Sequence, residues 1–305
     1  AVYPPEQELA DIVKQVRSEK LEAYVDNVKQ EPLMAQAPKA GKIKKTEENK
    51  QLGFKKLTLS NGAKVIIKKT DFKDDEIQFA ASANIGYAAY QNDPINAQNA
   101  SAVWGLSGLG EFSSNDLEKA LAGKQCGVDF SFSTFRHGLS GTTTPKDLET
   151  MMQLVYLNMT NVTKDQKAFD NMKNTYTTVL ANKSNNPRLV YQDSVQSTLY
   201  LGSKLARIPE ADIQSIDYDA CLEMWHQLYS NAKDFTFYFV GNYDEKVLLP
   251  LIEQYIASLP NQGMKIKIKN QPMPCATGKV SNVFTKAMEN PQSQAREMWF
   301  AKMPY

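Results

Sequence analysis

The chain has 305 residues, of which 42% are hydrophobic and 23% charged, a composition typical of a folded protein with about two domains. Its formal net charge is +1, so the overall field gives no reason to expect nucleic acid or an anionic membrane as a partner. Apolar runs such as 247–249 are far shorter than the roughly 20 residues of a membrane-spanning helix. We therefore expect no membrane span.

The first 49 residues predict a helix and a linker. In residues 3–29 the apolar positions have helical spacing, at Leu9, Ile12, Val13 and Val16. Residues 30–49 are typical of an exposed linker, because they contain prolines, a glycine and a run of Lys and Glu. We place a domain boundary near residue 50.

Strands dominate the next part of the chain. Two β-rich runs within 54–67 meet at Asn61-Gly62, which predicts a hairpin with a primed turn. A strand at 76–83 directs Ile77, Phe79 and Ala81 inward. Residues 99–141 then predict an apolar segment, a Gly-rich turn at Gly108 and Gly110, a capped helix at 115–122, and a strand in which Val128, Phe130 and Phe132 alternate.

Helices dominate the part after residue 141. Thr144-Pro145-Lys146-Asp147 predicts a capped helix start. Further helices are expected at 169–180, at 187–201 and after the caps Asp217 and Asp244, with a central strand at 235–240. After a linker at 264–278, two more strands are expected at 280–286 and 295–303. These patterns predict an α+β domain at 50–263 and, at 264–305, a linker with the first strands of an incomplete following domain.

Several motifs together resemble the pitrilysin (insulinase) family of zinc peptidases, which are inverzincins. They are Leu59-Ser60-Asn61-Gly62-Ala63-Lys64-Val65, the block 102–141, Thr144-Pro145-Lys146-Asp147-Leu148, and Phe239-Val240-Gly241-Asn242. The resemblance implies an α/β roll of the pitrilysin/LuxS-like metallohydrolase type, mostly antiparallel with helices on one face. It also implies two halves that close around a peptide, with zinc in the first half. This chain would be the hinge (1–49), the third domain (50–263) and the start of the fourth.

The zinc chemistry of this family needs a His-x-x-Glu-His helix and a later Glu. The chain has two histidines, His137 and His226, and neither lies in such a motif. At the corresponding places, residues 101–106 are Ser-Ala-Val-Trp-Gly-Leu and residues 175–182 are Thr-Tyr-Thr-Thr-Val-Leu-Ala-Asn. We therefore assign no catalytic, cofactor-binding or metal-binding residue, and expect zinc only in an N-terminal half absent from this chain.

Other residues have both a functional and a structural interpretation. His137 could face a chamber or be a hydrogen-bonded structural histidine, and His226 is expected in solvent. Cys126 and His137 could be nucleophile and base. The three cysteines, Cys126, Cys221 and Cys275, are otherwise expected as free, buried or half-buried thiols.

Two further clusters remain open in the same way. Glu111, Asp116 and Glu118 could form an acid pair, although an acid at 116 favours helix capping after Ser113 or Ser114. Three aromatic residues could grip a peptide or belong to the core: Phe130, Phe132 and Phe135.

Two functions fit these observations. The first is the non-catalytic C-terminal portion of a zinc metalloendopeptidase, inactive alone, that forms part of a peptide-binding chamber wall and binds peptides by strand addition. The alternative is a structural or peptide-binding subunit of the same fold without peptidase activity. The partners would be the N-terminal half of the same protein or a partner subunit, and unfolded or short peptides.

The termini give two further expectations. The chain begins at Ala1 without a signal-peptide pattern and ends at Tyr305 within a predicted strand, so we interpret it as a processed or excised fragment. The resemblance implies a bacterial periplasm or cell envelope. It also places a substrate-holding Arg and Tyr pair beyond the chain end.

Overall fold

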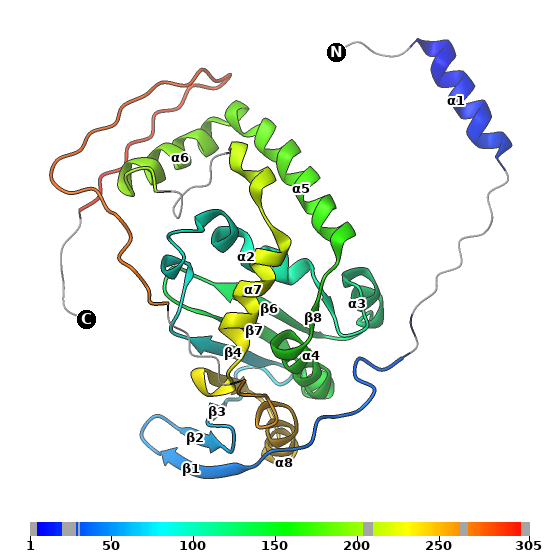
Figure 1. The fold of residues 1–305 in the computed structure, drawn as a ribbon, viewed down its shortest axis with the longest axis vertical. Helices are drawn as coiled ribbons and strands as arrows, with labels where there is room; N and C mark the ends of the chain where they lie inside the picture. Colours follow the sequence, from blue (N-terminus) through cyan, green and yellow to red (C-terminus); the bar gives the residue numbers. More distant parts are fainter. Residues whose placement is uncertain (1–4, 20–28, 30, 204–209, 263–267, 300–305) are drawn as a thin grey trace. The chain divides into compact units, whose positions relative to one another are not determined.

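The computed structural model describes residues 5–19, 29, 31–203, 210–262 and 268–299. They divide into two compact units, residues 1–30 and 31–305. The first contains helix α1 (Glu6–Ser18) (Figure 1). The four apolar positions predicted to share its face are about half exposed: Leu9, Ile12, Val13 and Val16. The rest of the predicted helix, at 20–28, lies outside the described residues.

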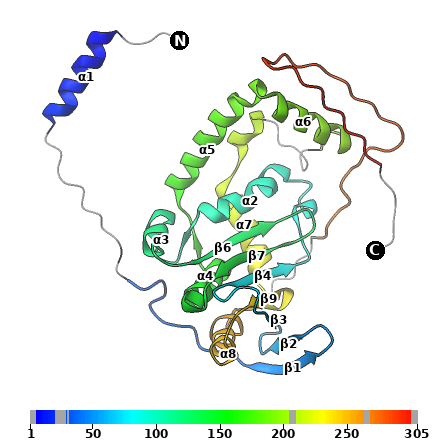
Figure 2. The ribbon, with the colours of Figure 1, turned by 180° about the vertical axis from the view of Figure 1, so that it is seen from behind.

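A seven-stranded sheet forms the centre of the second unit, in the order β1-β2-β3-β9-β4-β7-β6 (Figures 1 and 2). Only the pairing of β3 with β9 is parallel, so the predicted, mostly antiparallel α+β fold is confirmed. The strands are β1 (Ile43–Asn49), β2 (Phe54–Leu59), β3 (Lys64–Lys69), β4 (Ile77–Ala83), β6 (Cys126–Phe132), β7 (His137–Thr143) and β9 (Thr236–Gly241). A separate two-stranded ladder joins β5 (Gly108–Leu109) to β8 (Val162–Thr163).

Helices cover one face of this sheet. The α-helices of the second unit are α2 (Pro94–Leu106), α3 (Ser114–Ala120), α4 (Leu148–Thr160), α5 (Gln166–Ala181), α6 (Pro187–Leu199), α7 (Tyr218–Tyr229) and α8 (Glu245–Leu251), which continues as a π-helical turn (Ile252–Ile256). Short 3-10 turns lie at Tyr87–Ala89, Pro145–Asp147, Lys183–Asn185, Glu210–Ser215 and Ala232–Asp234. In the described part of the chain, no helix has both the length and the apolar character needed to cross a bilayer.

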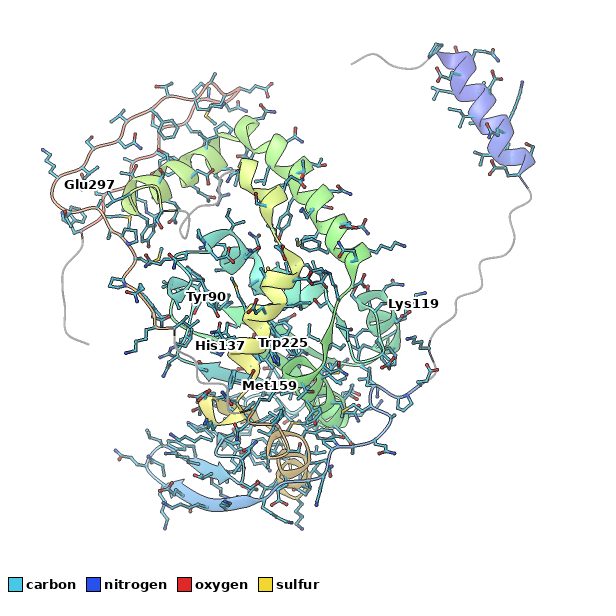
Figure 3. All side chains as sticks on the ribbon, viewed as in Figure 1. Tyr90, Lys119, His137, Met159, Trp225 and Glu297 are labelled. Carbon is cyan, nitrogen blue, oxygen red and sulfur yellow. The ribbon has the colours of Figure 1, made fainter. Side chains whose placement is uncertain are left out.

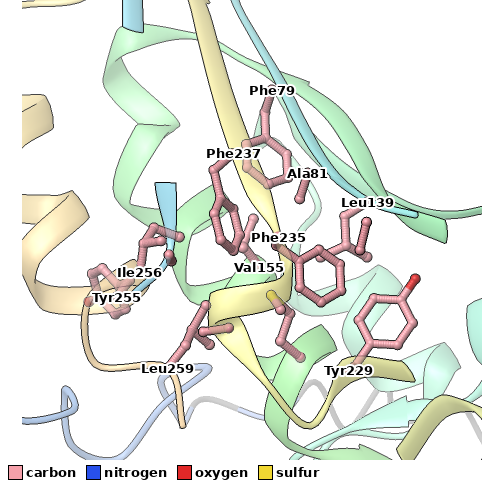
Figure 4. Packing of buried hydrophobic residues seen from close by; sticks show 14 of the residues in the cluster. Phe79, Ala81, Leu139, Val155, Tyr229, Phe235, Phe237, Tyr255, Ile256 and Leu259 are labelled. Atoms are coloured by element: carbon pink, nitrogen blue, oxygen red, sulfur yellow. The ribbon is translucent and has the colours of Figure 1, made fainter. Parts of the chain in front are cut away.

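The core lies between the sheet and these helices. Alternate side chains of the strands are buried, as predicted for Ile77, Phe79 and Ala81. Figure 4 shows the rings of Phe79, Phe235 and Phe237 packed together in this layer. The intervening residues of the strands, such as Gln78, lie on a sheet face that the helices leave open.

The predicted helix starts agree with the structure. The Thr144 side chain accepts a hydrogen bond from the Asp147 amide, Asp217 from the Ala220 amide, and Asp244 from the Lys246 amide. These contacts satisfy amides that have no partner inside the helix. The local sequence therefore determines where these helical segments begin.

The predicted hairpin is present, but its turn is different. The Leu59 amide donates to the Ala63 carbonyl oxygen, and the Gly62 amide donates to the Leu59 carbonyl oxygen. Only Gly62 is left-handed, with φ +88°, so the loop has three residues and is not a primed two-residue turn. The Asn61 side chain donates to the carbonyl oxygens of Ile256 and Leu259 at 2.8 and 3.1 Å. A contact distant in sequence therefore holds the loop.

Three other predictions need correction. Residues 43–49 are not an exposed linker, because they form β1 and pair with β2. The strand β7, which begins at His137, was not predicted. Residues 280–286 contain no strand; instead the Asn282 amide donates to the Ser194 and Thr198 hydroxyls, both at 2.8 Å. A strand needs a neighbouring ladder, and no described residue supplies one there. Residues 300–303 of the last predicted strand lie outside the described residues.

Candidate functional site

The position that resembles a zinc motif, residues 101–106, lies at the end of α2, where Val103 and Trp104 pack in the hydrophobic core and Ala102 and Gly105 are exposed. Val103 and Trp104 are 0% and 1% exposed. The Trp104 ring meets the rings of Phe130, Phe132 and Tyr229, with centroids 5.5, 5.2 and 5.8 Å away. No side chain from 101 to 106 carries an imidazole, carboxylate or thiolate. These residues do not fit a zinc ion.

The other possible metal ligands are the remaining His, Cys, Asp and Glu side chains. Among the residues that the structure describes, no three His, Cys, Asp or Glu side chains are grouped so that they could hold a metal ion. At the second expected place, on α5, the Asn182 side chain donates to the Thr178 carbonyl oxygen. That contact belongs to the helix itself.

His137 is buried between the sheet and α7 (Figure 3). Its Nδ1 lies 2.7 Å from the Ile85 carbonyl oxygen and its Nε2 lies 3.1 Å from the Leu228 carbonyl oxygen. The rings of Tyr229 and Phe235 meet it edge-on. Burial lowers the pKa of this imidazole, although hydrogen bonds to both carbonyl groups oppose the shift. The structural interpretation of His137 is therefore confirmed.

His226 is exposed on α7, as predicted. Cys126 and His137 do not form a dyad: Cys126 pairs with Thr143 at one end of the β6–β7 ladder, and His137 pairs with Phe132 at the other. Six residues of strand separate the two ends, or about 20 Å. Burial also raises the pKa of the Cys126 thiol, which disfavours the nucleophilic thiolate.

Asp116, one of the three acidic residues near α3, takes part in the contacts at the start of that helix. The Ser113 hydroxyl oxygen accepts a hydrogen bond from the Asp116 amide, and the Ser113 hydroxyl donates to the Asp116 carboxylate at 2.8 Å. The Ser113 side chain thus caps α3, and the Asp116 carboxylate accepts from the Ser113 hydroxyl and not from a backbone amide. The structure therefore agrees with the capping interpretation of Asp116.

The three aromatic residues separate into two groups. Phe130 and Phe132 pack against the core, whereas Phe135, in the β6–β7 turn, is 51% exposed. The core interpretation is thus correct for two of them and wrong for Phe135.

The β6 strand presents free backbone groups at one edge of the sheet. The Ser133 amide donates to the Arg136 carbonyl oxygen, and the Thr144 amide donates to the Gln125 carbonyl oxygen. The facing pairs 133–136 and 125–144, at the two ends of the β6–β7 ladder, are therefore hydrogen-bonded pairs. Because these pairs alternate, residues 127, 129 and 131 direct their amides and carbonyls toward β7. The backbone groups of Cys126, Val128 and Phe130 therefore point away from the sheet, where another strand could pair.

The opposite edge, β1, is different in character. Its sequence is Ile-Lys-Lys-Thr-Glu-Glu-Asn, and Lys45 and Glu47 form an ion pair at 2.9 Å. Charged side chains of this kind discourage edge-to-edge pairing. In β6 the only charged residue is Asp129. The sheet thus has one charged edge and one edge open to strand addition.

A hollow of about 710 Å³ lies between α6 and residues 276–298. Tyr191 and Phe284 stack across it with centroids 6.5 Å apart. The hollow contains neither histidine, and one of its walls has no regular secondary structure.

The fold is an α+β sheet with helices on one face, and the position that resembles the metal motif contains the buried side chains of Val103 and Trp104, so the fold fits the family resemblance without its zinc ligands. A comparison with protein families agrees: residues 215–304 match the peptidase M16 inactive domain. The resemblance seen in the sequence is confirmed, and the chain is homologous to the inactive C-terminal domain of M16 zinc proteases.

Individual relatives extend this similarity over most of the chain. The probable zinc protease PqqL of Escherichia coli strain K12 is 28% identical over 287 residues, covering 93% of this chain and 29% of that protein. The crystal structure of the periplasmic protease PqqL from Escherichia coli matches with a TM-score of 0.67 at 26% identity, over 90% of this chain and 30% of that one.

A second solved structure shares the fold at lower identity. It is the ferredoxin protease FusC, as an E83A mutant in complex with Arabidopsis ferredoxin, with a TM-score of 0.68 and 20% identity over 91% of this chain and 30% of that one. The chain thus spans less than a third of the length of each of these relatives.

Proposed function

We propose that this chain is the non-catalytic C-terminal portion of a zinc metalloendopeptidase and forms part of the wall of its peptide-binding chamber. The observation that carries the proposal is the β6 edge, where the amides and carbonyls of Cys126, Val128 and Phe130 point away from the sheet. An extended peptide could add there as an eighth strand through backbone hydrogen bonds, with little dependence on its sequence. Cleavage would take place in another part of the protein.

The proposed domain organisation follows the family resemblance. Residues 1–49 would connect the two halves, residues 50–263 would form the third domain, and residues 264–305 would lead into the fourth. Since β1 lies at 43–49, the connecting segment would end before that strand. The partner of this chain would be the N-terminal half of the same protein or a separate subunit, which would supply the zinc site.

The proposed compartment is the bacterial periplasm or cell envelope. It is supported by the similarity to a protease described as periplasmic in Escherichia coli. Unfolded or short peptides are the proposed ligands, because backbone pairing at β6 needs an extended segment.

The test of the β6 edge is a Val128→Pro variant. Proline removes the outward amide of residue 128 and leaves the ladder with β7 intact, since residue 128 does not donate to β7. Val128→Ala is the matched control, because it loses the same side-chain packing but keeps the amide. Binding of a fluorescent extended peptide, measured by anisotropy, should weaken about two- to tenfold in Val128→Pro relative to Val128→Ala. Equal affinities would contradict strand addition at β6.

A second test concerns activity. The 305-residue chain alone should not cleave a quenched fluorescent peptide. Joined to the rest of its reading frame, the protein should cleave this peptide in a chelator-sensitive manner. Chelator-sensitive cleavage by the chain alone would overturn the non-catalytic assignment, and a complete reading frame without any zinc motif would favour the structural subunit.

A further inference from the structure

Asp129 is a charged residue in the middle of the open-edge strand. Its side chain is exposed and lies on the sheet face that the helices leave uncovered, because Val128 and Phe130 on either side pack toward the core. Asp is depleted in β-strands, where β-branched and aromatic residues are favoured. A residue that conflicts with its local structure often has a functional reason.

Among the residues that the structure describes, the carboxylate of Asp129 has no hydrogen-bond or ion-pair partner. On the neighbouring strand β7, Asp129 faces Ser140, which carries no charge. Asp129 is therefore available to a cation that approaches along the edge.

A shallow depression of about 390 Å³ adjoins Asp129 on this open face. Its rim carries the polar side chains of Gln78, Ser140 and Thr142, and its floor is backbone at Gly127 and Gly141. A Cβ atom built on Gly127 would meet no other atom within 4 Å. The space above Gly127 is thus open to a side chain from outside the molecule.

A strand that pairs with β6 would bring its side chains to this place. Residues of the added strand opposite Asp129 would direct their side chains to the open face, because facing residues of paired strands share a face of the sheet. Their Cβ atoms would lie about 4.5–5.5 Å from that of Asp129. A long basic side chain in this position could reach the Asp129 carboxylate and lie across the two glycines. The hydroxyl oxygens of Ser140 and Thr142 and the side-chain carbonyl oxygen of Gln78 could also accept hydrogen bonds from it.

We propose that Asp129 and the depression beside it form a subsite for a Lys or Arg side chain of the peptide that pairs with β6. The proposal rests on the proposed strand addition and adds a preference to it: the chain selects extended segments with a basic residue at the position that faces Asp129. Backbone pairing supplies the binding, and the Asp129 subsite sets register and composition.

The test uses three short peptides that are identical except at alternate positions, which carry Lys, Gln or Glu, so that registers two residues apart all present this residue to Asp129. Anisotropy with the 305-residue chain should show the Lys peptide bound about two- to fivefold more tightly than the Gln peptide, the range of cross-strand pairs of opposite charge. Asp129→Asn should remove this preference, and Asp129→Lys should shift it to the Glu peptide.

Asp219→Asn is the matched control for net charge. Asp219 is an exposed carboxylate at the start of α7, on the helix side, where it pairs with Lys164. This variant should keep the preference for Lys. A further variant, Gly127→Leu, adds a side chain beside Asp129 whose Cβ would meet no atom within 4 Å, and it should weaken binding of the Lys peptide.

The outcomes separate the two proposals. If Val128→Pro weakens all three peptides but the wild-type chain binds Lys and Gln peptides equally, the Asp129 subsite is wrong and strand addition stands. The subsite is also wrong if Asp219→Asn removes the preference as fully as Asp129→Asn, since the effect would then be one of net charge. If Val128→Pro leaves binding unchanged, the β6 edge is not the binding place and both proposals fail.

Discussion

The indole N–H of Trp104 donates to the carbonyl oxygen of Cys221 at 2.7 Å. This hydrogen bond joins α2 to α7 at the place where the family resemblance would put a metal-binding helix. Both residues are buried, at 1% and 0% exposure. The contact therefore belongs to the core, and its loss should affect stability.

We expect Trp104→Phe to lower the free energy of unfolding by about 1–3 kcal/mol, because it leaves a buried carbonyl short of a donor. Trp104→Ala should cost about 3–5 kcal/mol, since a cavity is added. Trp299→Phe is the matched control, as Trp299 is 83% exposed and should change stability by less than about 0.5 kcal/mol. Urea denaturation followed by circular dichroism measures all three. A Trp104→Phe protein as stable as the control would contradict the role of this contact.

His137 should make stability depend on pH. Its pKa in the folded chain lies below the ordinary value of 6.5 because of burial, so the unfolded chain binds more protons between the two values. The free energy of unfolding should therefore fall as the pH drops through 6.5 toward the lowered pKa. Denaturation of the wild type and of His137→Phe at several pH values tests this, because the variant should lose that part of the pH dependence.

The control for this experiment is His226→Gln, which removes a histidine from an exposed position of α7. It should retain the pH dependence of the wild type. A His137→Phe protein with an unchanged pH profile would show that another group titrates on unfolding.

The Ser113 cap should stabilise α3. Ser113→Ala removes the acceptor for the Asp116 amide and should cost about 0.5–2 kcal/mol. Ser113→Asp keeps a capping oxygen and should cost much less. If both variants unfold at the same denaturant concentration, the cap contributes nothing measurable.

Zinc should not be a component of this chain as purified. The reason is chemical: residues 101–106 carry no imidazole, carboxylate or thiolate, and the Trp104 ring is packed against Phe130 and Phe132. Elemental analysis should return well below one zinc per chain, and a chelator should leave the thermal midpoint unchanged. One tightly bound zinc per chain would contradict the conclusion that residues 101–106 do not fit a zinc ion.

Much of the fold could be predicted from local patterns. The strand at Ile77–Ala83 follows from residues that alternate, and the helix starts follow from caps at Thr144, Asp217 and Asp244. The alternation of buried residues and the cap hydrogen bonds both involve residues close in sequence, so the local sequence contains the signal for these elements, although the ladder partners of this strand lie in β7 and β9. The absence of a His-x-x-Glu-His motif is also visible in the sequence.

Other features escaped prediction because their partners lie far away in the sequence. The linker-like composition of β1 concealed a strand that exists by pairing with β2, and the strand-like 280–286 has no ladder beside it among the described residues. Asp129 was not singled out, although an acid inside an alternating apolar strand was a visible signal. Its meaning depends on β6 being the edge.

The sequence by itself determined the local elements, the caps, the absence of a zinc motif and the family resemblance, because each is written in neighbouring residues. Only the tertiary structure decided that β9 enters the sheet between β3 and β4 and that β6 ends it. The order of the strands depends on which residues are buried against each other, and those residues lie far apart in the sequence. No local sequence pattern encodes such contacts. That order leaves the amide of Val128 and the carboxylate of Asp129 side by side at the open edge.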